Sequence, residues 1–307
     1  MESEKIESFI QKLQSKEPLF TYEFHLPASF SVESLFEDLK SAEFVNNLSA
    51  FVCTDSPLGR LKHNAILGSL KLQNYFKIPS ITTISMRDKN TLALQGELIG
   101  MNSLDLRLIL ALTGDPLRLG NQPQAKGVFE GSSAALIKII YALNSKKDIN
   151  GLELSGDSKS IYPFCVLNSY AKVKENLYKK MYEKIKNGAL AIFTQPVYDL
   201  EIAQELLKWC ENINKELNTN CILVFGFFPI FSLKTALFLH HKLPGVFIPQ
   251  RILESFEKAH KSGNEEKEGL AQSRDLLSSL ITLQPKVHLM SSNKHKLINA
   301  VSKDILW

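Results

Sequence analysis

Eight short apolar segments that alternate with helical patterns are the feature that most limits what this chain can fold into. The segments have the length and composition of buried parallel strands, and they lie at residues 20–24, 50–54, 80–84, 108–112, 162–166, 190–194, 221–225 and 287–290. Amphipathic patterns predict helices at residues 4–15, 32–40, 90–100, 132–143, 171–187, 200–217, 232–240, 252–260 and 270–283.

Alternating strands and helices favour a (β/α)8 barrel, the TIM-barrel fold. An open doubly wound sheet is the alternative. The barrel is favoured by the number of strands, by the length of 307 residues, and because no change of composition marks a domain boundary. We therefore expect a single domain over residues 1–307. Two long segments, 114–131 and 144–161, are rich in Gly, Pro, Asn and Ser, and long loops in compact domains are often functional.

Composition excludes several classes of protein. Hydrophobic residues make up 44% of the chain, charged residues 22%, and the net charge is +4, as in an ordinary globular protein. Lys and Arg are spread along the chain, so no nucleic-acid surface is expected. The most basic stretch, 172–186, also carries Glu175 and Glu183 and is better explained as a solvated helix face.

Cysteine and histidine patterns predict neither disulfides nor a metal site. The four cysteines form no C-x-x-C pair, three lie in apolar strand-like segments, and no H-E-x-x-H motif is present. The amino terminus lacks an apolar signal sequence, and no apolar run approaches the roughly 18 residues of a membrane span. Together these observations predict a cytoplasmic protein without a membrane segment.

Polar side chains follow several of the predicted strands at the point where each strand ends. Asp115 comes after the strand at 108–112 and lies between Gly114 and Pro116. Thr54 and Asp55, then Thr194 and Gln195, occupy similar positions, and Ser-Ser-Asn at 291–293 follows the last strand. In a barrel these strand ends meet at one mouth, where α/β enzymes bind substrate. Taken alone, Asp115 could equally cap a turn.

Glu23 lies within the first predicted strand, between two aromatic residues. Partial burial is expected to raise its pKa, which suits a general acid. A salt-bridged core carboxylate explains the position equally well. The chain contains no G-x-G-x-x-G, Walker A or G-x-S-x-G motif, so neither a Rossmann nucleotide site nor a hydrolase elbow is predicted.

Motifs spread over nearly the whole chain carry a resemblance to a known family. They are YEF at 22–24, VCTDSPLGR at 52–60, RDKN at 87–90, LTGDP at 112–116, TQPVYD at 194–199 and GVFIP at 245–249. In combination they resemble the methylenetetrahydrofolate reductases, flavoproteins that make methyltetrahydrofolate for methionine synthesis. The resemblance implies a (β/α)8 barrel, FAD as cofactor, methylenetetrahydrofolate as substrate, and NADH, NADPH or an electron-transfer protein as donor.

The resemblance also implies residue roles. Glu23 would be the general acid that protonates N10 of the folate, and Asp115 would stabilise the cationic intermediate and approach both ligands. Substrate contacts would come from Asp115, Gln195, Leu233 and Lys294. Flavin contacts would come from Thr54, Thr83, Leu112, Thr113, Gly114, Asp115, Asn168 and Lys184, with Lys184 near the diphosphate.

Three positions depart from the family pattern. Thr83 stands where many members have a histidine, and Leu233 replaces an aromatic residue that stacks on folate and nicotinamide in some members. His25-Leu26-Pro27 stands where F-F-P-P follows the acid. These changes leave the donor open, and the sequence also leaves open whether the chain forms a homo-oligomer. The alternatives are a catalytically weak folate- or flavin-binding paralogue in an assembly, and a non-flavin barrel enzyme such as a lyase.

Overall fold

Parallel strands close into a barrel at the centre of the protein. The computed structural model describes residues 2–306, and within them eight strands pair in sequence order, with β1 closing against β8. The strands are β1 (Leu19–Phe24), β2 (Ala50–Cys53), β3 (Ser80–Ser85), β4 (Leu108–Leu112), β5 (Tyr162–Leu167), β6 (Ala191–Pro196), β7 (Ile222–Phe227) and β8 (Lys286–Leu289). The predicted (β/α)8 barrel is therefore confirmed.

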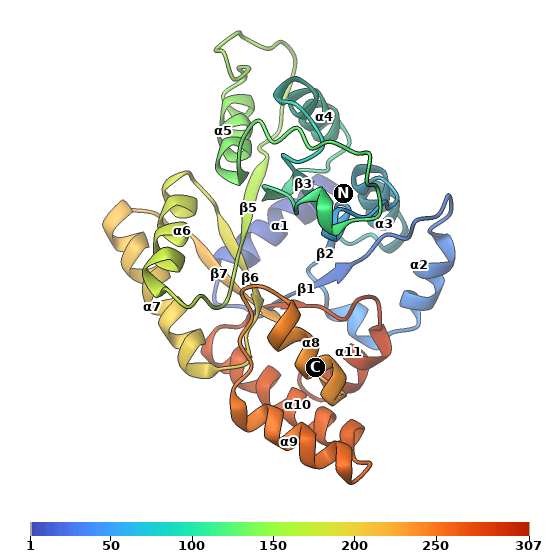
Figure 1. Ribbon diagram of the computed structural model, residues 1–307. Helices are drawn as coiled ribbons and strands as arrows, with labels where there is room; N and C mark the ends of the chain where they lie inside the picture. Colours follow the sequence, from blue (N-terminus) through green and yellow to red (C-terminus); the bar gives the residue numbers. More distant parts are fainter. Residues whose placement is uncertain (1, 307) are drawn as a thin grey trace.

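Helices surround the barrel and connect consecutive strands (Figure 1). They are α1 (Glu2–Gln14), α2 (Glu33–Lys40), α3 (Ala65–Phe76), α4 (Thr91–Ser103), α5 (Ser133–Asn144), α6 (Lys174–Lys186), α7 (Leu200–Leu217), α8 (Leu233–Lys242), α9 (Gln250–Lys261), α10 (Glu265–Leu283) and α11 (His295–Ser302). Short 3-10 turns lie at η1 (Glu43–Asn47), η2 (Pro57–Gly59) and η3 (Leu117–Leu119). Among residues 2–306, no helix combines the length and the apolar content needed to cross a lipid bilayer.

Alternation along each strand divides the apolar residues between two cores. Outward residues such as Tyr22 and Phe24 pack against the helices, whereas inward residues such as Leu19 and Ala50 fill the barrel. Helix α1 completes the inner core, because its apolar face lies against the amino end of the barrel. The same alternation carries the inward positions of β1 from Leu19 through Thr21 to Glu23 at the other end.

Two helices, α3 and α11, were not indicated by the sequence pattern. Helix α3 contains Gly68 and Ser69, both poor helix formers, which weaken its amphipathic signal. The glycine allows close packing, because a Cβ there would lie 2.6 Å from the methyl carbons of the buried Leu26 side chain. The glycine that weakens the local pattern of α3 thus makes a contact with a distant part of the chain.

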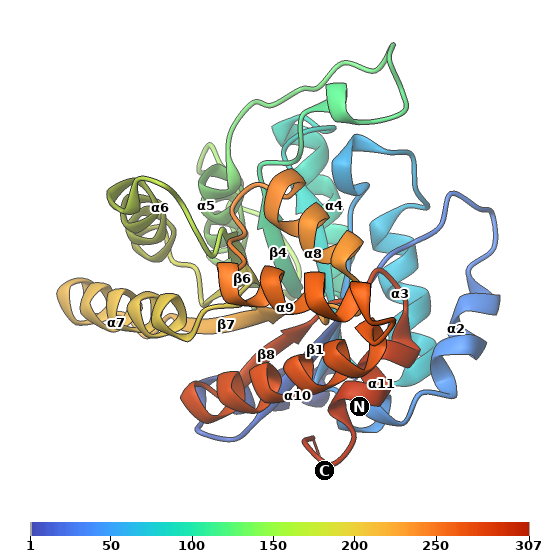
Figure 2. The ribbon, with the colours of Figure 1, turned by 60° about the horizontal axis from the view of Figure 1, so that its bottom comes forward.

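The two long segments lie at opposite ends of the barrel. Segment 114–131 follows β4 at the carboxyl end and arches outward at the top of Figure 2, where it carries η3. Segment 144–161 leads from α5 back to the amino end, where Lys159 pairs with Asp105 at 2.8 Å. Only the first of these segments can therefore contribute to a site at the carboxyl ends of the strands.

All four cysteines are free and buried. Burial raises the pKa of Cys53 to about 12 and that of Cys165 to about 11. Both thiols stay protonated at neutral pH, as expected for inert core residues.

Candidate active site

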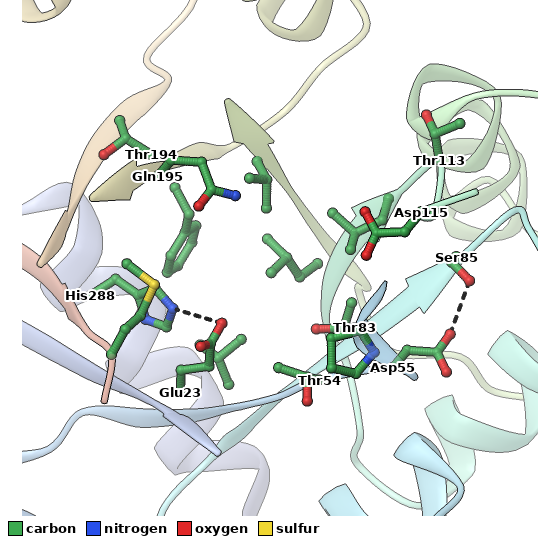
Figure 3. Close-up of a pocket in the computed structure, with 18 of the residues that line it drawn as sticks. Glu23, Thr54, Asp55, Thr83, Ser85, Thr113, Asp115, Thr194, Gln195 and His288 are labelled. Atoms are coloured by element: carbon green, nitrogen blue, oxygen red, sulfur yellow. Dashed lines mark hydrogen bonds and ion pairs between the residues drawn. The ribbon is translucent and has the colours of Figure 1, made fainter. Parts of the chain in front are cut away.

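A cavity of about 330 Å³ opens at the carboxyl ends of the strands (Figure 3). Three of the five residues predicted to act on the substrate line it, namely Glu23, Asp115 and Gln195. Most of the predicted flavin contacts line it too, namely Thr54, Thr83, Leu112, Thr113, Gly114 and Asn168. The structure thus brings residues from six consecutive strands, β1 to β6, to one mouth, and their individual roles stay predictions.

Glu23 contacts two histidines. Nε2 of His25 lies 2.8 Å from Oε1 of Glu23, and Nε2 of His288 lies 3.9 Å from Oε2. The other ring nitrogen of His288 hydrogen-bonds the Thr21 hydroxyl at 2.9 Å, which fixes the orientation of that ring. Figure 3 shows His288, on β8, pointing toward Glu23 on β1. Each carboxylate oxygen therefore has an imidazole beside it.

These contacts reverse the predicted pKa shift of Glu23. Burial alone raises the pKa, but the charge and hydrogen bond of His25, with a smaller contribution from His288, outweigh burial and hold the pKa below its ordinary value. The prediction of a raised pKa is wrong, because it counted burial and missed both imidazoles. Glu23 is an ion-paired carboxylate, as the core interpretation predicts. It also lines the cavity, as the general-acid interpretation predicts.

The turn after β4 places Asp115 at the rim. Gly114 has a φ of +97°, and a Cβ there would lie 2.6 Å from the Cβ of Arg87, so this position requires glycine. Oδ2 of Asp115 accepts a hydrogen bond of 2.7 Å from the backbone N–H of Leu58 in η2. This bond joins the loops after β2 and β4 and fixes the carboxylate at the mouth.

Gln195 lies at an irregularity in the sheet. Phe193 pairs with Val224 and Pro196 with Gly226, so one extra residue of β6 is accommodated between the two pairs. Gly226 permits the close approach, because a Cβ there would lie 2.3 Å from the carbonyl oxygen of Thr194. Bulges of this kind often redirect a side chain beside an active site. The structure therefore supplies a local reason for the placement of Gln195.

A second cavity of about 460 Å³ adjoins the first and shares Thr113, Val166 and Asn168 with it. Lys184 lines this cavity, and its Nζ lies 3.0 Å from the hydroxyl of Ser133 in the first turn of α5. An ammonium group and the amino end of a helix both favour a bound anion. The predicted position of Lys184 thus lies next to the main cavity, on the β5 side.

Two predicted substrate contacts do not line the main cavity. Leu233 is half-buried at the start of α8, where its backbone N–H donates to Glu265 at 2.7 Å. Lys294 is exposed just before α11, and its backbone N–H donates to the Ser291 carbonyl at 3.0 Å. Their roles stay predictions.

Sequence reasoning gave no role to His288, which lines the mouth. A sequence signal for this residue does exist. The apolar Val287 and Leu289 on either side indicate that His288 faces the opposite way, into the barrel. Asp55, which the sequence pattern places at a strand end, lies two residues after β2 and accepts a hydrogen bond of 3.1 Å from Ser85. Burial raises the pKa of Asp55, and this effect exceeds the lowering by Lys89, Ser85 and Arg87.

Comparison with known proteins agrees with this geometry. The family model described as methylenetetrahydrofolate reductase matches residues 8–305. The chain belongs to the methylenetetrahydrofolate reductase family. No curated protein sequence matches the chain at the threshold of significance.

Solved structures share the fold with this family member at low sequence identity. One is an uncharacterized protein from Clostridium thermocellum that binds two copies of 5-methyl-5,6,7,8-tetrahydrofolic acid; it has a TM-score of 0.65 and 16% identity, over 96% of this chain and 98% of that one. Another is EDTA monooxygenase from Chelativorans sp. BNC1, with a TM-score of 0.55 and 10% identity, over 94% and 93% of the two chains. DmoA from Hyphomicrobium sulfonivorans also has a TM-score of 0.55, with 9% identity, over 94% and 87%.

Proposed function

We propose that the protein is a flavin-dependent reductase that converts 5,10-methylenetetrahydrofolate to 5-methyltetrahydrofolate for methionine synthesis. The observation that carries this proposal is the convergence of Glu23, Asp115 and Gln195 on one cavity, in a chain of this family. Opening and reducing the folate ring would require three groups. These are a carboxyl group that can deliver a proton, a second carboxylate and an amide.

Two features of the cavities fit FAD as the cofactor. The hydroxyl of Thr83 is buried at the main cavity and has no hydrogen-bond partner, as expected for a group that contacts a ligand. The adjoining cavity offers Lys184 and the start of α5 to a diphosphate. Thr54, Leu112, Gly114 and Asn168 would complete the contacts. When bound, FAD supplies the hydride that reduces the folate.

The chain's own residues would prepare the folate for that hydride. Glu23 delivers a proton to N10, which makes the amine a better leaving group and opens the five-membered ring. Asp115 stabilises the positive charge that develops on the folate. Gln195 hydrogen-bonds the pterin and orients the methylene carbon.

A second candidate is a folate-binding protein with little catalytic activity. Glu23 is held below its ordinary pKa beside two histidines, and this state favours the carboxylate over the acid. One structural neighbour is described as binding two copies of methyltetrahydrofolate, with no reaction named. These observations favour a paralogue that binds folate, with or without flavin, in an assembly.

The natural electron donor is expected to be NADH or NADPH, bound weakly, or else an electron-transfer protein. Leu233 stands where some members have an aromatic residue that stacks on the nicotinamide. A stacked ring contributes roughly 0.5–1.5 kcal/mol to the binding free energy beyond burial, and Leu233 lacks this contribution. Stopped-flow reduction of bound flavin should therefore require about tenfold more NADH than a stacking residue would allow. Rapid reduction that saturates at micromolar NADH would contradict this expectation.

The test of the function is the response of the purified protein to 5-methyltetrahydrofolate without oxygen. A yellow protein whose flavin absorption is bleached supports the reductase, because the folate half-reaction then runs in reverse. A yellow protein that binds the folate without bleaching would instead establish the paralogue. A protein that binds no flavin, even after incubation with excess FAD, would contradict the flavin mechanism. The four buried, free cysteines favour a cytoplasmic location for this reaction.

A further inference from the structure

His25 contacts the carboxylate of Glu23 directly but is not among the residues that line the cavity. The contact is a hydrogen bond of 2.8 Å, and the side chains of His25 and Glu23 are 26% and 23% exposed. The carboxylate therefore lines the cavity, and the imidazole beside it is partly exposed. This arrangement provides a path of two groups from the solvent to the substrate.

The loop after β8 holds His25 in place. The backbone N–H of His25 donates to Oδ1 of Asn293 at 2.9 Å, and its carbonyl accepts from Nδ2 of Asn293 at 2.7 Å. Asn293 has a φ of +63°, a left-handed conformation that asparagine tolerates better than most residues. One side chain thus clamps both backbone groups of His25, which sets the direction in which the ring leaves the strand.

The charged groups around the pair favour a proton on the imidazole. Burial lowers the pKa of His25, and so does Lys62, but the charge and hydrogen bond of Glu23 outweigh both and raise it. For Glu23, burial raises the pKa, but His25 and His288 lower it by more, so the pKa lies below its ordinary value. The pairing therefore favours an imidazolium beside a carboxylate.

That state is a difficulty for a general acid, because Glu23 must carry a proton when the folate ring opens. We propose that His25 is the proton reservoir of Glu23. Glu23 takes the proton from His25 and passes it to N10 of the folate. This inference rests on the proposed folate reduction. It makes His25 a positioning and proton-supplying residue that acts through Glu23 and does not touch the substrate.

The proton route balances. The N–H bond at Nε2 of His25 breaks as an O–H bond forms on Glu23. That O–H bond then breaks as an N–H bond forms at N10, and the bond from N10 to the methylene carbon breaks with its electron pair left on N10. His25 and Glu23 end as neutral imidazole and carboxylate, and a proton from solvent restores the imidazolium.

Replacement of His25 tests the route. His25→Gln keeps a hydrogen-bond donor but cannot titrate, and His25→Phe restores the aromatic residue of the family pattern. In single-turnover oxidation of reduced flavin by methylenetetrahydrofolate, the wild-type rate should fall as the pH rises through the His25 pKa. His25→Gln should be slower by about 100-fold at neutral pH and should lack this limb of the profile. Reduction of the flavin by its donor should be unchanged in both variants.

The control is His241→Gln, an exposed histidine on α8 that should retain both the rate and the pH profile. A readout without turnover is the NMR titration of ring-labelled histidine. Glu23→Gln should lower the His25 pKa, because burial and Lys62 then act without the carboxylate. An unmoved His25 titration would overturn the proposal.

The outcomes separate this inference from the proposed function. Wild-type protein without any folate turnover would overturn the function and the proton route together. Wild-type turnover with the same pH profile in His25→Gln would overturn the route alone. A slow His25→Gln variant whose profile keeps the falling limb would show that His25 only positions Glu23, and this result would also contradict the route.

Discussion

The two ends of the barrel share the same strands but differ in what those strands carry. At the amino end, Ile6, Phe9 and Leu13 of α1 pack into an apolar inner core. At the carboxyl end, inward positions of the same sheet carry polar side chains such as Glu23 and Gln195. Because each strand alternates in the same way at both ends, the difference arises from residue choice and not from geometry.

Buried polar groups occur at both ends of the barrel. At the amino end the buried guanidinium of Arg107 is paired with Glu7 at 3.0 Å and with Asp105 at 3.1 Å. At the carboxyl end the Thr83 hydroxyl is buried without a partner. An unsatisfied buried hydroxyl destabilises the free protein, and a ligand can compensate for it. In this comparison a buried charge at the amino end is paired, whereas polar groups at the carboxyl end line a cavity, where this fold binds its ligands.

The largest change in stability is expected from Phe9→Ala. Phe9 is buried, and its ring lies 6.1 Å from that of Phe164, so truncation leaves a cavity under the barrel. The free energy of unfolding should fall by about 3–5 kcal/mol, as measured by chemical denaturation. The matched change at the mouth is Thr83→Val, which removes an unpartnered hydroxyl and should alter stability by less than about 1 kcal/mol. Equal losses in the two variants would remove the distinction between the ends.

Lys286, buried at the amino end, should make the free energy of unfolding depend on pH. Burial, assisted by Lys12, lowers its pKa to about 8, below that of a lysine in the unfolded chain. The unfolded chain therefore binds this proton more tightly, and the charged form weakens the fold. The free energy of unfolding should rise between about pH 8 and pH 10, by up to about 3 kcal/mol.

Lys286→Met provides the control for this titration. Its unfolding should lose most of that rise, because the group that titrates is gone. The neutral amine of the wild-type protein can still donate to the carbonyls of Lys12 and Glu17, so no hydrogen bond opposes the trend. A wild-type stability that falls over the same pH range would show that the ammonium is favoured at this position.

Asp115→Asn is the smaller test at the mouth. The amide keeps the shape and the acceptor for the Leu58 N–H but removes the charge. The folate half-reaction should slow by about tenfold, which corresponds to about 1.4 kcal/mol, and flavin reduction should slow less. If both half-reactions slow equally, Asp115 anchors the flavin or the loop and has no special effect on the folate.

Sequence patterns predicted the barrel and its mouth because both follow from local alternation. Every predicted strand is present, and strand-end residues such as Asp115 and Gln195 meet at one cavity. The partners of Glu23 could not be predicted in the same way. His288 is distant in sequence and reaches Glu23 only because β8 closes against β1. His25 is only two residues away, but its contact depends on Asn293 in the loop after β8.

The central claim is that the mouth acts on folate through Glu23, and the most direct measurement compares the two half-reactions in Glu23→Gln. The variant should bind flavin and be reduced by its donor at the wild-type rate. Oxidation of its reduced flavin by methylenetetrahydrofolate should be slower by about 10²–10⁴-fold, because the amide cannot deliver a proton to N10. Folate turnover close to that of the wild-type protein would contradict the account.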